Sequence, residues 1–202
     1  MPSSNTWLNF ALVAVIVTLV PGPAFIVVLT TALCRGFKPG AYATAGIVAG
    51  DGVYFFLTAL GLGSLLATSF WTFTIIKWLG IAYLVYLGVR SLLFPNNSLI
   101  AAEGRSKRSS FVTALTVQLA NPKLLLFLAA LLPQFLDPTH PIAPQLAVLG
   151  GTFMLSDTLI YLLLSMVAAR ARPVLTSPQA TRIVSRVSGV AMLGAAARVA
   201  TK

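Results

Sequence analysis

Acidic residues are scarce in this chain, with only four aspartates and glutamates among 202 residues. Charged residues of both signs together make up 9%, whereas a soluble globular domain carries about 25%. Since 57% of the residues are hydrophobic, a fold in water would expose large apolar patches. The lack of charge therefore excludes an ordinary soluble domain and predicts an integral membrane protein.

Metal-ligating and nucleophilic side chains are also rare, because the chain has one cysteine, Cys34, and one histidine, His140. A single cysteine excludes an intramolecular disulfide, a CxxC pair and a soft-metal site. No nucleophile–base pair or metal cluster is visible, so we expect no enzyme, no cofactor and no metal site. The net charge of +10 could suggest nucleic acid, but the basic loops are short and lack a stacking platform.

Apolar runs of the length of a membrane span, about 20 residues, fill most of the chain. We expect helical spans near residues 7–33, 41–62, 72–89, 111–132, 146–169 and 187–197. The last run is short: eleven residues separate Arg186 from Arg198, and these cover only about 16 Å of a core roughly 30 Å thick. An interfacial helix and five spans are the alternative to six spans in a single membrane domain, 1–202.

Basic residues are distributed unevenly between the expected loops. The first, third and fifth loops hold ten of them: Arg35, Lys38, Arg90, Arg105, Lys107, Arg108, Arg170, Arg172, Arg182 and Arg186. Since cytoplasmic loops are enriched in lysine and arginine, this distribution places the odd loops in the cytoplasm and the N-terminus outside.

Two halves of the chain, about 1–92 and 111–202, share three features around a polar cytoplasmic loop at about 93–110. Each half begins with a span interrupted by proline, continues with a span holding one aspartate, and ends with a span that starts basic and then meets glycine. Three spans per half give the halves opposite topology, as in many secondary transporters. The predicted fold is an all-α polytopic membrane protein with six transmembrane helices as two inverted three-helix repeats, although polytopic proteins also show weak self-similarity by chance.

Proline motifs break the first and fourth expected spans, at Pro21-Gly22-Pro23 and at Asn121-Pro122. A proline inside a helix removes a backbone hydrogen bond and clashes with the preceding turn. The half-helix ends would then direct partial charges at the midplane, where an N-terminus suits a carboxylate and a C-terminus suits a cation. A zwitterion such as an amino acid needs both, and a simple kink is the alternative interpretation.

Three ionisable residues lie near the middle of expected spans: Asp51, Asp157 and Lys123. Each would cost roughly 2.5–3.5 kcal/mol at the bilayer centre, so they should face inward and pair. We interpret the aspartates as proton or substrate-amine sites and Lys123 as their countercharge; a static ion pair that locks the bundle is the alternative. Gln118, one turn before Asn121, is expected either to bond substrate or to satisfy backbone freed by Pro122.

Glycines recur around the second expected span, including Gly46 and Gly50. Small residues allow helices in lipid to approach closely. Helix packing is one role for them, and lining a moving interface is the other.

These motifs together resemble the LysE/RhtB family of amino acid exporters. The resemblance extends over nearly the whole chain and rests on Val20-Pro21-Gly22-Pro23, Gly36-Phe37-Lys38-Pro39-Gly40, Gly46, Gly50-Asp51, the run from Lys77 to Gly88, Asn121-Pro122-Lys123 and Leu132-Pro133-Gln134-Phe135. It implies a multi-pass protein of the bacterial inner membrane that exports amino acids or their derivatives, coupled to the proton gradient.

The substrate and the oligomeric state stay open at this level. The resemblance does not select one amino acid, although one lysine and two aspartates at midplane favour a small neutral amino acid over a dibasic one. Amino acid, protons and membrane lipid are the expected partners, and both a monomer and a homodimer are compatible with the sequence. An uncoupled channel or facilitator for small polar solutes is the alternative function.

Overall fold

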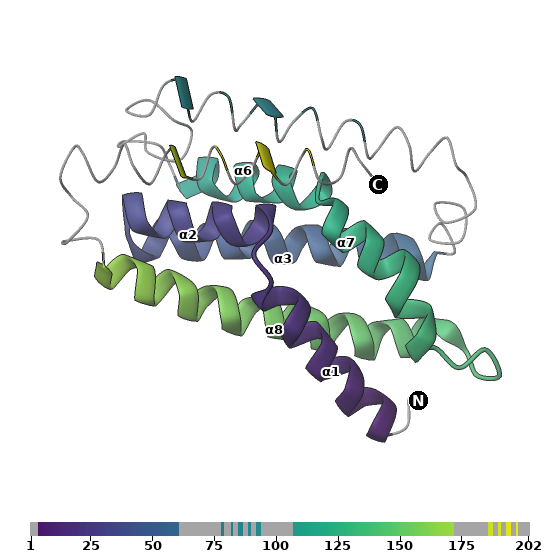
Figure 1. Cartoon of the computed structure of the whole chain (residues 1–202). Helices are drawn as coiled ribbons and strands as arrows, with labels where there is room; N and C mark the ends of the chain where they lie inside the picture. The colour runs from purple at the N-terminus through teal and green to yellow at the C-terminus, as the bar shows by residue number, and fades with distance from the viewer. Residues whose placement is uncertain are drawn as a thin grey trace.

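The computed structural model describes residues 4–60 and 107–171, with single positions between 78 and 93 and between 186 and 197. The helices of the two continuous stretches are α1 (Ser4–Leu19), α2 (Pro23–Arg35), α3 (Phe37–Ala59), α6 (Lys107–Leu119), α7 (Pro122–Leu126), the π-helical η1 (Phe127–Leu131), the 3-10 segment η2 (Leu132–Phe135) and α8 (Ile142–Ala171) (Figure 1). This part of the chain is all-helical, as predicted. The predicted third and sixth spans and most of the polar loop lie outside the described residues, apart from those single positions.

The first expected span consists of two helices that meet at a sharp bend. α1 ends at Leu19, α2 begins at Pro23, and their axes differ by 58°. Pro23 occupies the first turn of α2, where its missing N–H is not needed and its fixed φ suits the helix. Gly22 precedes it in an extended conformation, with φ −151° and ψ −175°.

The turn that we expected over residues 35–40 is a single residue in the structure. Only Gly36 separates α2 from α3, so α3 begins at Phe37 rather than near residue 41. Gly36 has a φ of 89°, a region that favours glycine, and its N–H donates to the Ala32 carbonyl at 2.8 Å. Pro39 fits because it falls in the first turn of α3, where backbone N–H groups have no partner within the helix.

The second half also departs from the predicted boundaries. α6 begins at Lys107 rather than near residue 111, and α8 begins at Ile142 rather than near residue 146. Pro144 is compatible with the early start because it too lies in a first turn. Between α6 and α8, Ala120 and Asn121 separate α6 from α7, and the chain then reaches α8 through η1, η2 and a short loop.

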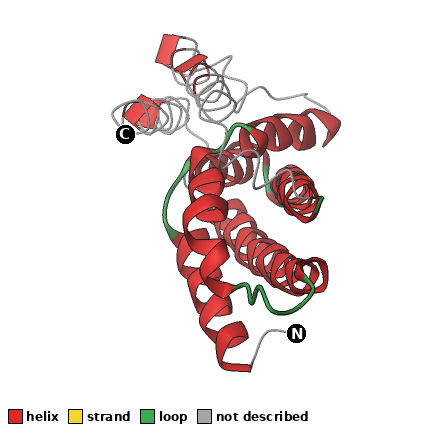
Figure 2. Cartoon of the chain, turned by 90° about the vertical axis from the view of Figure 1, so that its right-hand side faces the viewer, coloured by secondary structure: helices red, strands yellow, loops and turns green. Residues whose placement is uncertain are grey.

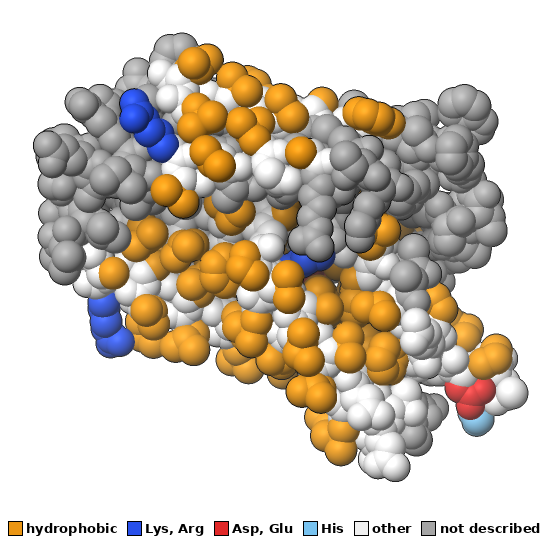
Figure 3. All heavy atoms as spheres, viewed as in Figure 1, with side chains coloured by type: hydrophobic (Ala, Val, Ile, Leu, Met, Phe, Trp, Pro, Cys, Tyr) orange, Lys and Arg blue, Asp and Glu red, His pale blue; other side chains and the backbone are white. Residues whose placement is uncertain are grey.

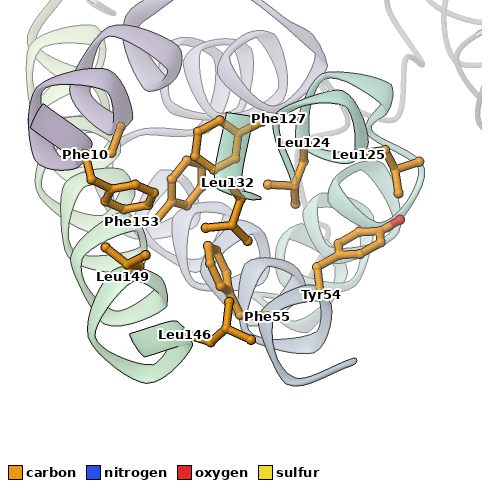
Figure 4. Packing of buried hydrophobic residues seen from close by; sticks show 11 residues of the cluster. Phe10, Tyr54, Phe55, Leu124, Leu125, Phe127, Leu132, Leu146, Leu149 and Phe153 are labelled. Carbon is orange, nitrogen blue, oxygen red and sulfur yellow. The ribbon is translucent and has the colours of Figure 1, made fainter. Parts of the chain in front are cut away.

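α3 lies at the centre of the described bundle, in contact with α2, α6 and α8, while α1 crosses α8 (Figures 1 and 2). One cluster of buried residues joins α1, α3, the α7–η1 segment and α8, and it is rich in aromatic rings (Figure 4). Phe127 stacks on Phe153 with ring centroids 4.8 Å apart, and Phe10 meets Phe135 edge-on at 5.2 Å. A second cluster joins α2, α3, α6 and α8.

The surface of the bundle is apolar where a soluble protein would be polar. Along α8 an outward stripe of four residues is more than half exposed: Leu155 58%, Leu159 61%, Leu163 57% and Val167 56%. Orange apolar side chains cover much of the face in Figure 3. By length and composition, α8 and the bent α1–α2 pair could each cross a membrane. Exposed apolar stripes around a polar interior fit a protein whose outer solvent is lipid.

Candidate substrate and proton site

The break between α1 and α2 leaves a carbonyl without its helical donor. In an α-helix the Val17 carbonyl would accept from the N–H four residues on, which is the missing N–H of Pro21. Lys123 Nζ donates to this carbonyl at 2.8 Å and to the Val20 carbonyl at 2.9 Å. Its stem passes Gly22 so closely that a Cβ there would lie 3.5 Å from Lys123 Cδ and Nζ. Lys123 therefore places a cation at the C-terminal end of α1, where the helix dipole favours it.

The break between α6 and α7 also leaves a carbonyl without its helical donor, and a side chain from the first half of the chain replaces that donor. The Leu119 carbonyl would accept the N–H of Lys123 in a continuous helix, but that N–H donates instead to Asn121 Oδ1 at 3.1 Å and so caps α7. The Tyr54 hydroxyl of α3 donates to the Leu119 carbonyl in its place. Each break thus receives a donor from the other half: Lys123 at the first and Tyr54 at the second.

Two carboxyl groups lie together at the centre of the bundle. Asp51 of α3 is 0% exposed and Asp157 of α8 is 2% exposed, and they are within hydrogen-bonding reach of each other when one carries a proton. Asp51 Oδ2 has no donor in the described part of the chain unless the Asp157 carboxyl supplies one. Two ionised carboxylates so close repel each other, and one shared proton removes the repulsion.

A chain of side-chain amides connects the carboxyl pair to the second break. Asn121 Nδ2 donates to Gln118 Oε1 at 2.8 Å, and Gln118 Nε2 donates to Asp51 Oδ1. Both amides are almost fully buried. The conformation around Asn121 is therefore coupled to the hydrogen bonding of Asp51.

Thr18 connects the other carboxyl group to the first break. Its hydroxyl donates to Asp157 Oδ1 and also lies 2.8 Å from the Ala14 carbonyl oxygen. A hydroxyl has one proton to donate and two lone pairs. If Asp157 is protonated, it can donate to Thr18 while Thr18 donates to Ala14; if Asp157 is ionised, Thr18 donates to the carboxylate.

Lys123 lies near the two carboxyl groups but forms no direct ion pair with them. In the loop before α8, His140 Nδ1 lies 3.0 Å from Asp137 Oδ2, a contact that is an ion pair only when the histidine is protonated. The ammonium of Lys123 interacts with Asp51 and Asp157 through space, while its hydrogen bonds go to the α1 carbonyls.

The polar cluster encloses little free space. A cavity of about 10 Å³ lies among it, lined by Val17, Thr18, Gln118, Asn121, Lys123, Leu124, Phe153, Asp157 and Tyr161. That volume is at the lower limit for one water molecule. In this conformation the site is closed around its own side chains, and an amino acid would have to displace some of them.

The structure brings five predicted site residues into this one region, namely Asp51, Gln118, Asn121, Lys123 and Asp157, and Gly22 lies beside the Lys123 side chain. Pro21, Pro23 and Pro122 lie at the two helix breaks. Sequence reasoning missed three contributors: Thr18, Tyr54 and the buried Tyr161. Each lies about one helical turn from a residue that we had singled out, namely Pro21, Asp51 or Asp157. Residues three or four apart share a helix face, so this spacing was the signal that could have identified them.

A family model described as "LysE type translocator" matches residues 15–202 of this chain. The chain belongs to the LysE type translocator family. The resemblance inferred from the proline, glycine and Asn-Pro-Lys motifs is thereby confirmed.

The LysE chain is also similar to individual bacterial proteins over most of its length. It is 32% identical over 199 residues to an "Uncharacterized membrane protein" of Vibrio cholerae serotype O1, covering 98% of this chain and 97% of that protein. It is 31% identical over 185 residues to the "Homoserine/homoserine lactone efflux protein" of Salmonella typhi, covering 91% and 90%. It is 34% identical over 144 residues to the "Leucine efflux protein" of Salmonella choleraesuis, covering 68% and 66%. No solved structure matches the chain.

Membership of the LysE family makes this chain a membrane translocator and not an enzyme, as the sequence predicted. The buried polar cluster between the two helix breaks is therefore a candidate site for a transported solute.

Proposed function

We propose that this LysE family member is a secondary transporter that exports amino acids or their derivatives from the bacterial cytoplasm in exchange for protons. Its site comprises Pro21, Gly22, Pro23, Asp51, Gln118, Asn121, Pro122, Lys123 and Asp157. The observation that carries the proposal is the buried Asp51–Asp157 pair, hydrogen-bonded to side chains at both helix breaks. The efflux proteins of Salmonella that the chain resembles support the substrate class.

Coupling follows from competition for the carboxyl pair. A substrate ammonium needs the pair ionised, while a shared proton satisfies the pair without substrate. Binding of the ammonium from the cytoplasm would therefore expel the proton, and a proton entering from outside would expel the ammonium. Because each occupant excludes the other, the inward flow of protons can drive the outward flow of substrate.

The change of conformation that moves the substrate across the membrane takes place at the two helix breaks. Thr18 relates the protonation of Asp157 to the last turn of α1, and Gln118 relates Asp51 to Asn121 at the start of α7. The proposal includes six spans in two inverted three-helix repeats, interrupted at these breaks. It also includes an inner-membrane location with the N-terminus outside, which the distribution of basic residues supports.

A proteoliposome assay tests the proposal. Purified full-length protein is reconstituted, and flux of a panel of labelled amino acids is followed with and without an imposed pH gradient. Asp51→Asn and Asp157→Asn keep the shape of the side chain but cannot release a proton. Each should abolish the gradient-driven part of the flux, whereas the matched control Asp137→Asn, in the exposed loop before α8, should retain it.

The outcomes separate the alternatives. Flux of amino acids that ignores the gradient in the wild type would favour an uncoupled facilitator and overturn proton exchange. Normal gradient-driven flux in both Asp51→Asn and Asp157→Asn would overturn their role. Absence of flux for every amino acid in the panel would overturn the proposed function as a whole.

A further inference from the structure

An apolar crevice lies between α1 and the α7–η1 segment, directly beside the polar cluster. Its volume is about 330 Å³, and it is lined by Lys123 and six apolar residues: Ile16, Val17, Val20, Leu126, Phe127 and Leu131. Pockets that bind small molecules are about 300–1,000 Å³ and are mostly apolar with a few polar groups. The crevice meets both criteria, since a single charged group lies among hydrocarbon side chains.

Lys123 forms the boundary between this crevice and the carboxyl pair. It lines the crevice on one side and the water-sized polar cavity beside Asp157 on the other. The polar cavity has no room for a side chain, whereas the crevice does. A ligand whose charged groups lie at the boundary would therefore extend its remaining atoms into the crevice.

The ammonium of Lys123 keeps binding capacity for such a ligand. It has three N–H donors, and within the described part of the chain two of them go to the Val17 and Val20 carbonyls. The third is available to a carboxylate. A ligand ammonium would be attracted to Asp51 and Asp157, and both charges would be met at one end of the crevice.

We propose that the crevice is the side-chain pocket for the exported substrate, and that this substrate is an amino acid with an uncharged aliphatic side chain. The inference rests on the proposed function and adds the substrate class. A charged or strongly polar side chain would find no partner among the six apolar residues, so it would be disfavoured. Lys123 binds the substrate carboxylate, and Ile16, Val20 and Leu131 contact the aliphatic chain.

The crevice predicts a graded dependence of affinity on side-chain length. Each buried methylene contributes about fourfold in affinity. Alanine, 2-aminobutyrate, norvaline and norleucine differ by one methylene each, so norleucine should compete roughly sixtyfold better than alanine. Norleucinamide lacks the carboxylate and should compete at least tenfold more weakly than norleucine.

The experiment measures competition by this series against labelled leucine in proteoliposomes of the full chain. Ile16→Phe fills the crevice and should reduce the preference for norleucine over alanine at least tenfold. Leu12→Phe is the matched control, because Leu12 is also on α1 and 61% exposed but does not line the crevice. It should leave the preference unchanged. Val20→Ala enlarges the crevice and should move the preference toward longer chains, which covers the case in which Ile16→Phe fails to fold.

Two results would overturn the inference while leaving amino acid export intact. One is a flat dependence on length in a protein that does transport amino acids. The other is an Ile16→Phe protein, folded and active, that behaves like Leu12→Phe, as expected if a lipid acyl chain occupies the crevice. Norleucinamide that competes as well as norleucine would overturn the carboxylate contact with Lys123. Failure to transport any amino acid would remove the proposed function itself.

Discussion

Among the described glycines, Gly46 of α3 leaves the least room for an added Cβ, and it gives the sharpest test of the α3–α6 interface. A Cβ at this position would lie 2.3 Å from the Phe111 carbonyl oxygen and 3.0 Å from Ala114 Cβ. Carbon and carbonyl oxygen normally approach to about 3.3 Å, so Gly46→Ala requires the two helices to separate by roughly 1 Å. The obstacle is backbone, which cannot rotate away as a side chain can.

The size of the effect follows from two opposing contributions. Overpacking costs about 1–3 kcal/mol, while replacing glycine by alanine within a helix stabilises by about 0.5–1 kcal/mol. Gly151 of α8 isolates the second contribution, because a Cβ there has nothing within 4 Å. The difference in unfolding free energy between Gly46→Ala and Gly151→Ala is therefore the overpacking cost alone. For a chain of this length it corresponds to a gap in Tm of roughly 2–12 °C.

Thermal unfolding of both variants in the same detergent micelles measures that gap. Transport per folded molecule, measured in parallel, distinguishes static packing from a moving interface. The added methyl group of Gly46→Ala should slow the transport cycle only if α3 and α6 move relative to each other during it. Equal Tm values for the two variants would refute the close approach of α3 and α6 at Gly46.

Two further predictions concern single hydrogen bonds. Tyr54→Phe removes the donor to the Leu119 carbonyl in a part-buried hydrogen bond and should lower the unfolding free energy by about 0.5–1.5 kcal/mol, and an unchanged Tm would contradict the capping of the second break. In the loop before α8, the hydroxyl and backbone N–H of Thr139 hold the pKa of Asp137 at about 2. Because the pKa of Asp137 is lower in the folded than in the unfolded protein, its hydrogen bonds stabilise the fold. This stabilisation is fully present above about pH 4 and is lost as the pH falls through about 2. Thr139→Ala removes the hydroxyl but keeps the backbone N–H, so it should raise the pKa of Asp137 part of the way toward its ordinary value in a carboxyl ¹³C titration. An unmoved titration would exclude the Thr139 hydroxyl as a cause.

The sequence predicted those features that depend on local covalent chemistry. Proline excludes a backbone donor wherever it occurs, so the ends of α1 and α6 lie close to the positions that Pro21 and Pro122 indicated. Helix starts were predicted too late at Phe37 and Ile142, because prolines in a first turn were read as loop residues when they are compatible with a helix.

Partners across the bundle could not be predicted, since they depend on how the helices approach one another. The charge of Lys123 suggested a carboxylate partner, yet its hydrogen bonds go to backbone carbonyls of α1. Counting four residues back from Pro21 would have identified Val17 as an orphaned acceptor, but nothing local indicates which side chain reaches it. The same applies to Tyr54, whose acceptor is on α6.

The exchange of donors between the two breaks has a consequence for biosynthesis. When the first hundred or so residues have left the ribosome, Lys123 has not yet emerged, so the Val17 carbonyl lacks the donor that it has in the folded protein. Until Lys123 arrives, water or a lipid headgroup must occupy its place. The first half of the protein therefore lacks a hydrogen-bond donor at the α1–α2 break until the second half is present. Halves produced separately should reach the native structure only when they are combined.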